Sequence, residues 1–152
     1  MKAVKNLKAE ASIFINSTEA KIWDVLTNPD KIKLFMFGSN VKTDWGIGNP
    51  IFFSRDRLYP SAPVLEKPIV DKGKILQIIN GKLLKFSFYN SMEGYEDVPE
   101  NYSIVTYSIE EVDKGRFRLN YLRELIPIDF ERENQERFLP GMMKQLKSLA
   151  EA

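Results

Sequence analysis

Two short helical segments stand back to back near the start of the chain, in STEAKIWDVLTNPDKIKLFMFG at residues 17–38. Ser17 is expected to cap the first helix, because a serine oxygen can accept a backbone N–H of the first turn. Asn28-Pro29 ends that helix, since the residue before a proline is pushed out of the helical region, and Pro29 can begin the second. One apolar face is expected on each helix: Ile22, Val25 and Leu26 on the first, and Ile32, Phe35 and Met36 on the second. Both helices therefore need an apolar surface to pack against.

Strand-like sequence surrounds these helices. Residues 7–15 alternate apolar and polar side chains, and the odd positions are expected to face the core. Asn80-Gly81 is a strong signal for a hairpin between two later strands. Further strands are expected within 41–55, around a Gly-Ile-Gly-Asn-Pro turn, and at 70–79, 83–89, 102–112 and 116–125, with an irregular proline-rich loop at 56–68. The one-sided alternation of the last two strands predicts an antiparallel sheet with one covered face.

The C-terminal segment is expected to cover that face. Its apolar residues fit a helical stripe of the kind that packs against a sheet: Phe138, Leu139, Met142, Met143, Leu146 and Leu149. Pro140-Gly141 interrupts the stripe, so the sequence predicts either a kink or a short helix up to Phe138 followed by a longer one from Pro140. In both cases the helices and the sheet together make an α+β fold.

Composition narrows the chemistry. The 152 residues suffice for one domain, expected to span 1–152, and they include neither cysteine nor histidine. Disulfides, thiol nucleophiles, Cys/His zinc sites and imidazole-based catalysis are therefore excluded, and no metal site or cofactor is expected. The 22 basic and 21 acidic residues nearly cancel, which argues against a nucleic acid or an anionic membrane as partner. The sequence contains neither a signal-peptide h-region nor an apolar run long enough to span a membrane, so a cytoplasmic location is expected.

Five stretches of the sequence resemble one bacterial family. They are STEAKIWDVLTNPDKIKLF, VKTDWGIGNP, GKILQI, YSIEEVDKGRFRL and LPGMMKQLKSLAE, in the order expected for the family and spread over nearly the whole chain. Through them the chain resembles the AHSA-type family, named after the activator of a heat-shock-protein ATPase, in the START/SRPBCC helix-grip superfamily. The resemblance implies a curved antiparallel sheet of about six or seven strands around a long C-terminal helix, with two short helices after the first strand. Such a helix-grip fold leaves an internal cavity between the helix and the sheet.

Aromatic side chains are the main candidates for lining that cavity. Given this fold, ten residues are expected to bind a ligand: Phe35, Phe37, Trp45, Phe52, Phe86, Phe88, Tyr107, Tyr121, Phe138 and Met142. Simple core packing is the competing interpretation for each, and Trp45, like Trp23, could instead lock a helix to the sheet. Met142 could belong to an adaptable wall against varied apolar ligands. Tyr107 or Tyr121 could orient a ligand carbonyl or hydroxyl.

Two charged stretches have alternative interpretations. Arg55-Asp56-Arg57 could hold a carboxylate or phosphate at the cavity rim, because arginine offers a planar fork of donors. It could equally be an exposed loop with local ion pairs. The acidic run at 93–100 lacks the ligand spacing of a calcium loop and is expected to be a solvated hairpin tip.

Three functions are compatible with these observations. The leading hypothesis is non-enzymatic binding of a small hydrophobic or amphipathic molecule in the cavity, by a monomer or weak homodimer. The resemblance implies a second, interaction with a chaperone ATPase as its activator, although no room is expected for the additional N-terminal domain of the eukaryotic activators. The third is an enzyme of the cyclase or hydrolase type that uses Tyr, Asp or Arg. The missing histidine weighs against it, and no catalytic residue is assigned.

Overall fold

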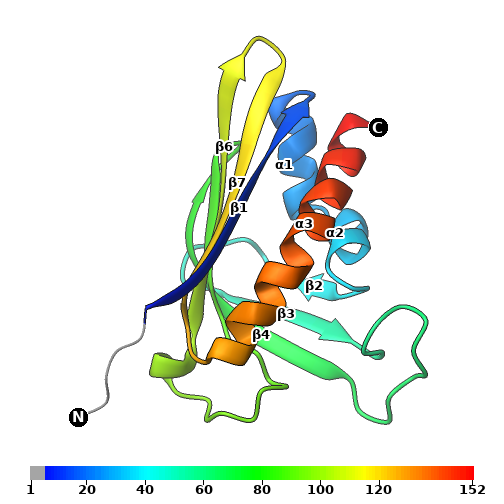
Figure 1. Cartoon of the computed structure of the whole chain (residues 1–152), viewed down its shortest axis with the longest axis vertical. Helices are drawn as coiled ribbons and strands as arrows, with labels where there is room; N and C mark the ends of the chain where they lie inside the picture. Colours follow the sequence, from blue (N-terminus) through cyan, green and yellow to red (C-terminus); the bar gives the residue numbers. More distant parts are fainter. Residues whose placement is uncertain (1–5) are drawn as a thin grey trace.

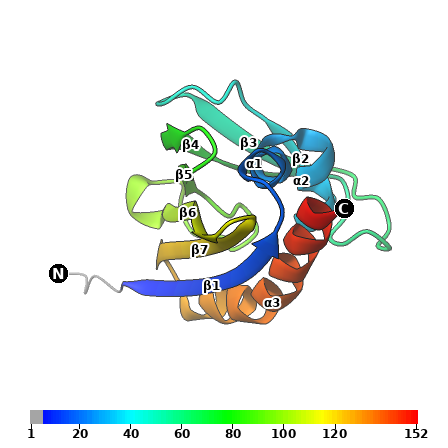
Figure 2. The same cartoon turned by 90° about the horizontal axis from the view of Figure 1, so that it is seen from above.

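Seven strands form one antiparallel sheet that curves around three helices (Figure 1, Figure 2). The computed structural model describes residues 6–152, so residues 1–5 of the predicted domain 1–152 lie outside the described part. The strands are β1 (Leu7–Asn16), β2 (Asn40–Lys42), β3 (Pro50–Arg55), β4 (Ile69–Ile79), β5 (Leu83–Phe88), β6 (Ser103–Asp113) and β7 (Arg116–Ile126). The helices are α1 (Glu19–Thr27), α2 (Pro29–Phe35) and α3 (Asp129–Glu151), with a 3-10 turn, η1 (Pro99–Asn101). The helix-grip arrangement expected from the resemblance is confirmed.

The strand order is β1-β7-β6-β5-β4-β3-β2, so the first and last strands of the chain are neighbours. Their pairing runs from Leu7 opposite Ile126 to Asn16 opposite Arg116. The hairpin predicted at Asn80-Gly81 joins β4 to β5, and Gly81 has the positive φ of 78° that such turns favour. The residues between β3 and β4 contain no strand, as the prolines of that segment predict.

The two short helices begin and end much as predicted, with one correction. Thr18, and not Ser17, caps α1, because the Thr18 oxygen accepts the backbone N–H of Lys21. Asn28 ends α1 and also caps α2, where its side chain accepts the backbone N–H of Asp30. Pro29 is the first residue of α2, a position at which the missing N–H costs nothing.

Ser17 instead helps to fasten the end of β1 to the end of α3. Its hydroxyl donates to the carbonyl of Ala150 at 2.7 Å, and the backbone N–H of Asn16 donates to Glu151 Oε2 at 2.8 Å. Lys147 Nζ donates to the carbonyl of Phe14 at 2.7 Å. These three bonds join residues more than 130 positions apart in the chain. We call this set the terminal latch.

The C-terminal segment forms one helix, which lies along β1 and follows a curved path (Figure 2). Pro140 lies inside α3, so the alternative of two separate helices is wrong. The helix also begins earlier than its apolar stripe indicates, at Asp129. Within residues 6–152, no helix combines the length and the apolar character that crossing a membrane requires.

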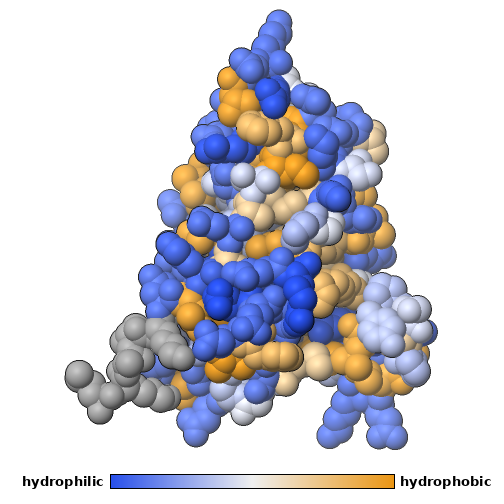
Figure 3. Space-filling model, in the orientation of Figure 1, coloured by the Kyte–Doolittle hydropathy of each residue, from blue (hydrophilic) through white to orange (hydrophobic). Residues whose placement is uncertain are grey.

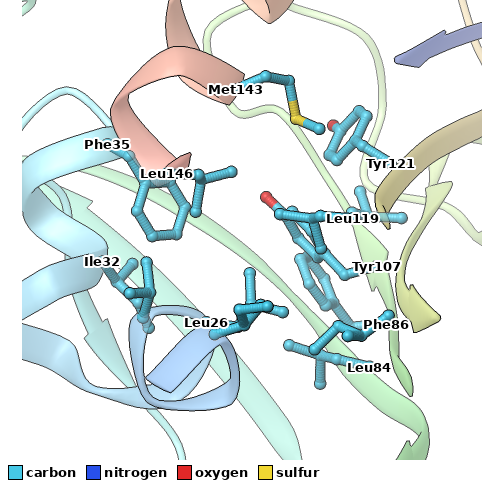
Figure 4. Packing of buried hydrophobic residues seen from close by; sticks show 14 of the residues in the cluster. Leu26, Ile32, Phe35, Leu84, Phe86, Tyr107, Leu119, Tyr121, Met143 and Leu146 are labelled. Atoms are coloured by element: carbon cyan, nitrogen blue, oxygen red, sulfur yellow. The ribbon is translucent and has the colours of Figure 1, made fainter. Parts of the chain in front are cut away.

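The core lies between the helices and the concave face of the sheet. The predicted alternation is confirmed on β1, β6 and β7. Most residues of the predicted apolar stripes on the helices are buried or half-buried, but Phe138 is 48% exposed. Buried residues include Ile15, Ile22, Val25, Leu26, Ile32, Phe35, Val105, Tyr107, Ile109, Phe117, Leu119, Tyr121, Met143 and Leu146. Figure 4 shows part of this cluster, in which Leu26, Ile32 and Phe35 from the short helices face Tyr107 and Leu119 from the sheet. Burying each of the larger ones contributes about 1.5–3 kcal/mol. The space that remains among α1, α2 and the sheet is only about 10 Å³, so side chains fill this part of the interior. We call this part the solid half of the grip.

A close backbone approach between β4 and β5 depends on a glycine. A Cβ atom built on Gly73 would lie 1.6 Å from the carbonyl oxygen of Ser87. Next to it, the Lys74 backbone N–H donates to the Ser87 hydroxyl at 3.0 Å. Only a residue without a side chain fits at this point of the sheet.

Candidate functional site

A cavity of about 450 Å³ opens between the first half of α3 and the sheet, away from the solid half of the grip. We call it the α3 cavity. Its apolar wall consists of Met36, Phe37, Phe53, Leu58, Phe88, Met92, Phe130 and Phe138. Its charged residues are Arg55, Asp71, Glu93, Arg123 and Glu131. The cavity therefore combines aromatic surface with a cluster of ionisable groups.

The deepest charged groups are Arg123 of β7 and Glu131 in the first turn of α3. Their side chains form an ion pair and are only 4% and 2% exposed. Arg123 Nε donates to the Ser103 hydroxyl at 2.8 Å, and the Tyr95 hydroxyl donates to Glu131 Oε1 at 2.7 Å. The Arg123 guanidinium also lies 5.0 Å from the centre of the Phe88 ring. Burial lowers the pKa of Arg123, but an arginine so surrounded stays charged, and both oxygens of its partner Glu131 accept a hydrogen bond.

A second pair, Arg55 of β3 and Asp71 of β4, lies nearer the opening. Asp71 is buried, and its Oδ1 accepts both the backbone N–H and the hydroxyl of Ser91, at 2.9 and 3.0 Å. Arg55 Nη1 lies 3.7 Å from Asp71 Oδ2, which is an ion-pair distance but too long for a hydrogen bond. Ser91 therefore fixes the carboxylate and leaves the guanidinium loosely held.

Two exposed rings, Phe37 and Phe138, are among the residues that line the α3 cavity. They pack edge to face with centroids 5.1 Å apart, and they also line a neighbouring hollow of about 570 Å³ between α2 and α3. Phe37 has a φ of 54°, in the left-handed region that a phenylalanine rarely adopts. On the face of the molecule that carries α3, apolar residues are interspersed with hydrophilic ones (Figure 3). The structure thus brings Phe37, Phe138 and Phe88 of the predicted site together at one cavity.

Most of the other predicted site residues belong to the solid half of the grip. Phe35, Trp45, Phe86 and Tyr107 line the residual space of about 10 Å³. Tyr121 is buried beside Tyr107, with ring centroids 5.1 Å apart, and lies near Met143 of α3 (Figure 4). In these positions the rings fill space and leave no room for a guest.

Two predicted residues lie elsewhere. Phe52 is 36% exposed on the outer face of the sheet, where it lines a groove with Lys72 and Lys74, so its expected position under the helix is wrong. Its neighbour Phe53 is 4% exposed and points into the concave side. Side chains along β3 alternate between the two faces of the sheet, and Ile51 is buried. Phe53 therefore points inward like Ile51, and Phe52 points outward. Met142 lines the hollow between α2 and α3 and not the α3 cavity.

The charged residues of the cavity, other than Arg55, were missed by the sequence interpretation. Arg123 follows Phe117, Leu119 and Tyr121 in the same alternation, so its inward direction could have been read from the strand pattern. Asp71 likewise shares its phase with Ile75. Glu131 precedes the apolar stripe of α3, and no local pattern marks it as buried. The acidic run is only partly the solvated tip expected, because Asp97 pairs with Lys72 and Glu93 lines the cavity.

Tyr121 should make the protein sensitive to alkali. Burial raises its pKa to about 12, and its hydroxyl donates to Gln135 Oε1 at 2.7 Å. In the unfolded chain, a tyrosine has a pKa of about 10 and loses its proton above that pH, whereas the folded chain still holds the Tyr121 proton. The contribution of Tyr121 to stability is therefore complete below pH 10 and is lost as the pH rises toward 12. We expect Tyr121→Phe to reduce the loss of unfolding free energy between pH 9 and pH 11 by about 1 kcal/mol, measured by urea denaturation. Tyr59→Phe, at an exposed position, is the control, and an equal effect of both variants would contradict the prediction.

Comparisons with known proteins agree with this architecture. A family model described as "Activator of Hsp90 ATPase homolog 1-like protein" matches residues 16–151. The solution structure of ChR145 from Cytophaga hutchinsonii is 30% identical, covers 97% of this chain and 94% of its own, and superposes with a TM-score of 0.76. No match to a curated protein was found.

Two further solved structures share the fold at lower identity. CV1439 from Chromobacterium violaceum is 15% identical, with 95% of this chain and 98% of that chain covered and a TM-score of 0.74. The Aha1 dimer from Colwellia psychrerythraea is also 15% identical, with 95% and 96% covered and a TM-score of 0.68.

Proposed function

The chain belongs to the family of Activator of Hsp90 ATPase homolog 1-like proteins, and from that premise we propose that it binds a small amphipathic molecule in the α3 cavity. The observation that supports the proposal is the cavity itself. Its volume of about 450 Å³ lies within the range of roughly 300–1,000 Å³ typical of small-molecule sites. Aromatic and thioether side chains would contribute affinity by removing apolar ligand surface from water. The charged groups would orient the polar end of the ligand.

The proposed role is binding and not catalysis. The two buried carboxylates of the cavity, Asp71 and Glu131, each face an arginine, and Glu131 also accepts a tyrosine hydroxyl. Such paired groups hold charge in place, whereas a general acid or base must be able to exchange a proton with a substrate. The cytoplasmic location and the monomeric or weakly dimeric state stay predictions.

A blocked cavity provides the test. Asn134 lines the α3 cavity, and Glu133 next to it on α3 does not. We expect N-phenyl-1-naphthylamine, a neutral fluorescent probe, to bind the wild type and to bind Asn134→Trp at least about tenfold more weakly, because the indole occupies ligand space. Glu133→Trp, on the exposed side of the same helix, should retain the wild-type affinity within about twofold.

Direct recovery of a ligand is the complementary measurement. Native mass spectrometry of freshly purified protein, followed by organic extraction, should recover a small molecule from the wild type and less of it from Asn134→Trp. A wild-type protein that is empty and does not bind the probe would rule out the proposed function.

The name of the matched family supports a second candidate, stimulation of a chaperone ATPase. The Colwellia relative is named as an Aha1 dimer, so self-association belongs to the same hypothesis. We would measure the ATPase rate of a purified Hsp90 with and without the protein, together with the protein's mass in solution. An unchanged rate at saturating protein would exclude this candidate and leave the binding proposal intact.

A further inference from the structure

If the proposed function is taken as the basis, the chemical class of the ligand's polar head group can be specified further. We infer that the ligand of the α3 cavity presents a neutral acceptor oxygen, such as the carbonyl of a ketone, ester or amide, to the guanidinium of Arg55. The inference rests on the hydrogen bonds that Arg55 lacks, on those that Arg123 already has, and on the balance of charge around both.

Arg55 has five N–H groups, but no oxygen of residues 6–152 accepts a hydrogen bond from them. Nε is buried without a partner. Nη1 faces Asp71 Oδ2 at 3.7 Å, and Nη2 contacts only the sulfur of Met92 at 3.3 Å. A thioether sulfur is a weak acceptor, and the Arg55 side chain is only 19% exposed, so water hydrates it poorly. A ligand oxygen at Nη2 would replace a poor partner with a good one.

Met92 is a side chain that a ligand could displace. It is 48% exposed, in the loop after β5, and it lines the cavity together with Leu58 and Phe130. Its unbranched chain can change rotamer at little energetic cost. A ligand entering between these residues would therefore bring its oxygen to Arg55 and keep its apolar part against the aromatic wall.

Arg123 is unsuited to the same task. Its guanidinium already has the Ser103 hydroxyl, the Glu131 carboxylate and the face of the Phe88 ring as partners. A ligand oxygen that took the place of the Glu131 carboxylate would have to break a buried ion pair, which is strongly unfavourable. Of the two arginines that line the cavity, Arg123 donates to two protein oxygens, whereas Arg55 donates to none of those in residues 6–152.

The charge balance selects a neutral acceptor over a carboxylate. The cavity is lined by two cationic side chains, Arg55 and Arg123, and by three acidic ones, Asp71, Glu93 and Glu131. A ligand carboxylate at Arg55 would share that guanidinium with Asp71 and add a fourth negative charge to a partly desolvated space. A carbonyl oxygen accepts the same hydrogen bond without this repulsion.

Displacement of N-phenyl-1-naphthylamine tests the inference, because this probe has no oxygen and no full charge. The competitors are 2-decanone, decanoate and decylamine, which share an apolar chain and differ in the head group. We expect 2-decanone to bind the wild type about tenfold more tightly than decylamine, whose ammonium has no acceptor oxygen for Arg55. We also expect it to bind about tenfold more tightly than decanoate, whose carboxylate is repelled by the acidic side chains of the cavity. Arg55→Met should lower the affinity for 2-decanone about tenfold and should change the affinity for the probe much less.

Two further variants control for indirect effects. Arg57→Met removes an arginine two residues away, whose Nη1 donates to the Ala62 carbonyl and which does not line the cavity, so 2-decanone binding should be unaffected. Arg55→Lys keeps a positive charge opposite Asp71, so it controls for misfolding caused by the loss of that charge. We expect it to bind 2-decanone with an affinity between those of the wild type and Arg55→Met, because its ammonium lacks the planar fork of donors.

The outcomes separate this inference from the proposed function. Failure of the wild type to bind the probe would overturn both. Probe binding with decanoate or decylamine as the tighter competitor would overturn the neutral head group alone. Equal 2-decanone affinities of the wild type and both Arg55 variants would remove Arg55 as the recognition residue, while ligand binding in the cavity would stand.

Discussion

Replacing Glu131 by leucine should lower the free energy of unfolding by about 3–5 kcal/mol. The leucine leaves the Arg123 guanidinium buried beside an apolar side chain and without its ion-pair partner. It also leaves the Tyr95 hydroxyl without its acceptor, at a position where burial already raises the pKa of Tyr95 to about 12. Moving a charge out of water without a partner is among the largest penalties that one substitution can cause. Urea denaturation at neutral pH measures the loss directly.

The double variant Arg123→Met/Glu131→Leu distinguishes the cost of an orphaned charge from the value of the pair. Two apolar side chains of similar volume need no counter-ion, so the double variant should recover most of the stability lost by Glu131→Leu. A single variant within about 1 kcal/mol of the wild type would mean that Arg123 finds water or another acceptor when Glu131 is gone. In that case the description of Arg123 and Glu131 as a buried ion pair would be wrong.

Replacing Gly73 by alanine should cost about 3 kcal/mol, the upper end of what overpacking usually costs. The added methyl would lie 1.6 Å from the Ser87 carbonyl oxygen, and a backbone atom cannot move aside as the end of a flexible side chain can. The pairing of β4 with β5 must therefore shift, with the loss of ladder hydrogen bonds around Lys72 and Tyr89. Chemical denaturation reports the size of the loss.

Gly141→Ala is the matched control, because the same methyl is added where nothing lies within 4 Å. Gly141 is in the interior of α3, so alanine should stabilise the protein by about 0.5–1 kcal/mol through reduced backbone entropy of the unfolded chain. Opposite signs for the two substitutions are the expected result. Two variants of equal stability would show that the sheet yields easily at Gly73.

The fold was predictable because its main signals are local and periodic. Alternation in β1, β6 and β7 and the helical spacing in α1 and α2 each report which side chains face the core. The N-cap residue of α1 was harder to predict than the helix itself, because Ser17 and Thr18 are adjacent and both carry a hydroxyl that can cap a helix. Ser17 was already engaged by Ala150, a partner that no local pattern reveals.

The site was harder to predict than the fold, because alternation locates side chains without saying whether space is left between them. Phe86 and Phe88 both lie on β5, yet the first packs in the solid half and the second lines the α3 cavity. The difference depends on how far α3 stands from the sheet, which is set by contacts distant in the sequence. Arg123 and Asp71 were predictable in direction, but their partners come from other elements.

The terminal latch and the neighbouring β1 and β7 have a consequence for synthesis on the ribosome. Strand β1 is made before its partner strand, which begins at Arg116, and before the α3 residues that accept from Asn16 and Ser17. At about 5–20 residues per second, β1 waits roughly 5–20 s for β7 to emerge. During that interval it is an unpaired strand with an apolar face, the kind of surface that promotes aggregation of nascent chains. Completion of the core therefore has to wait until both β7 and α3 have been synthesised.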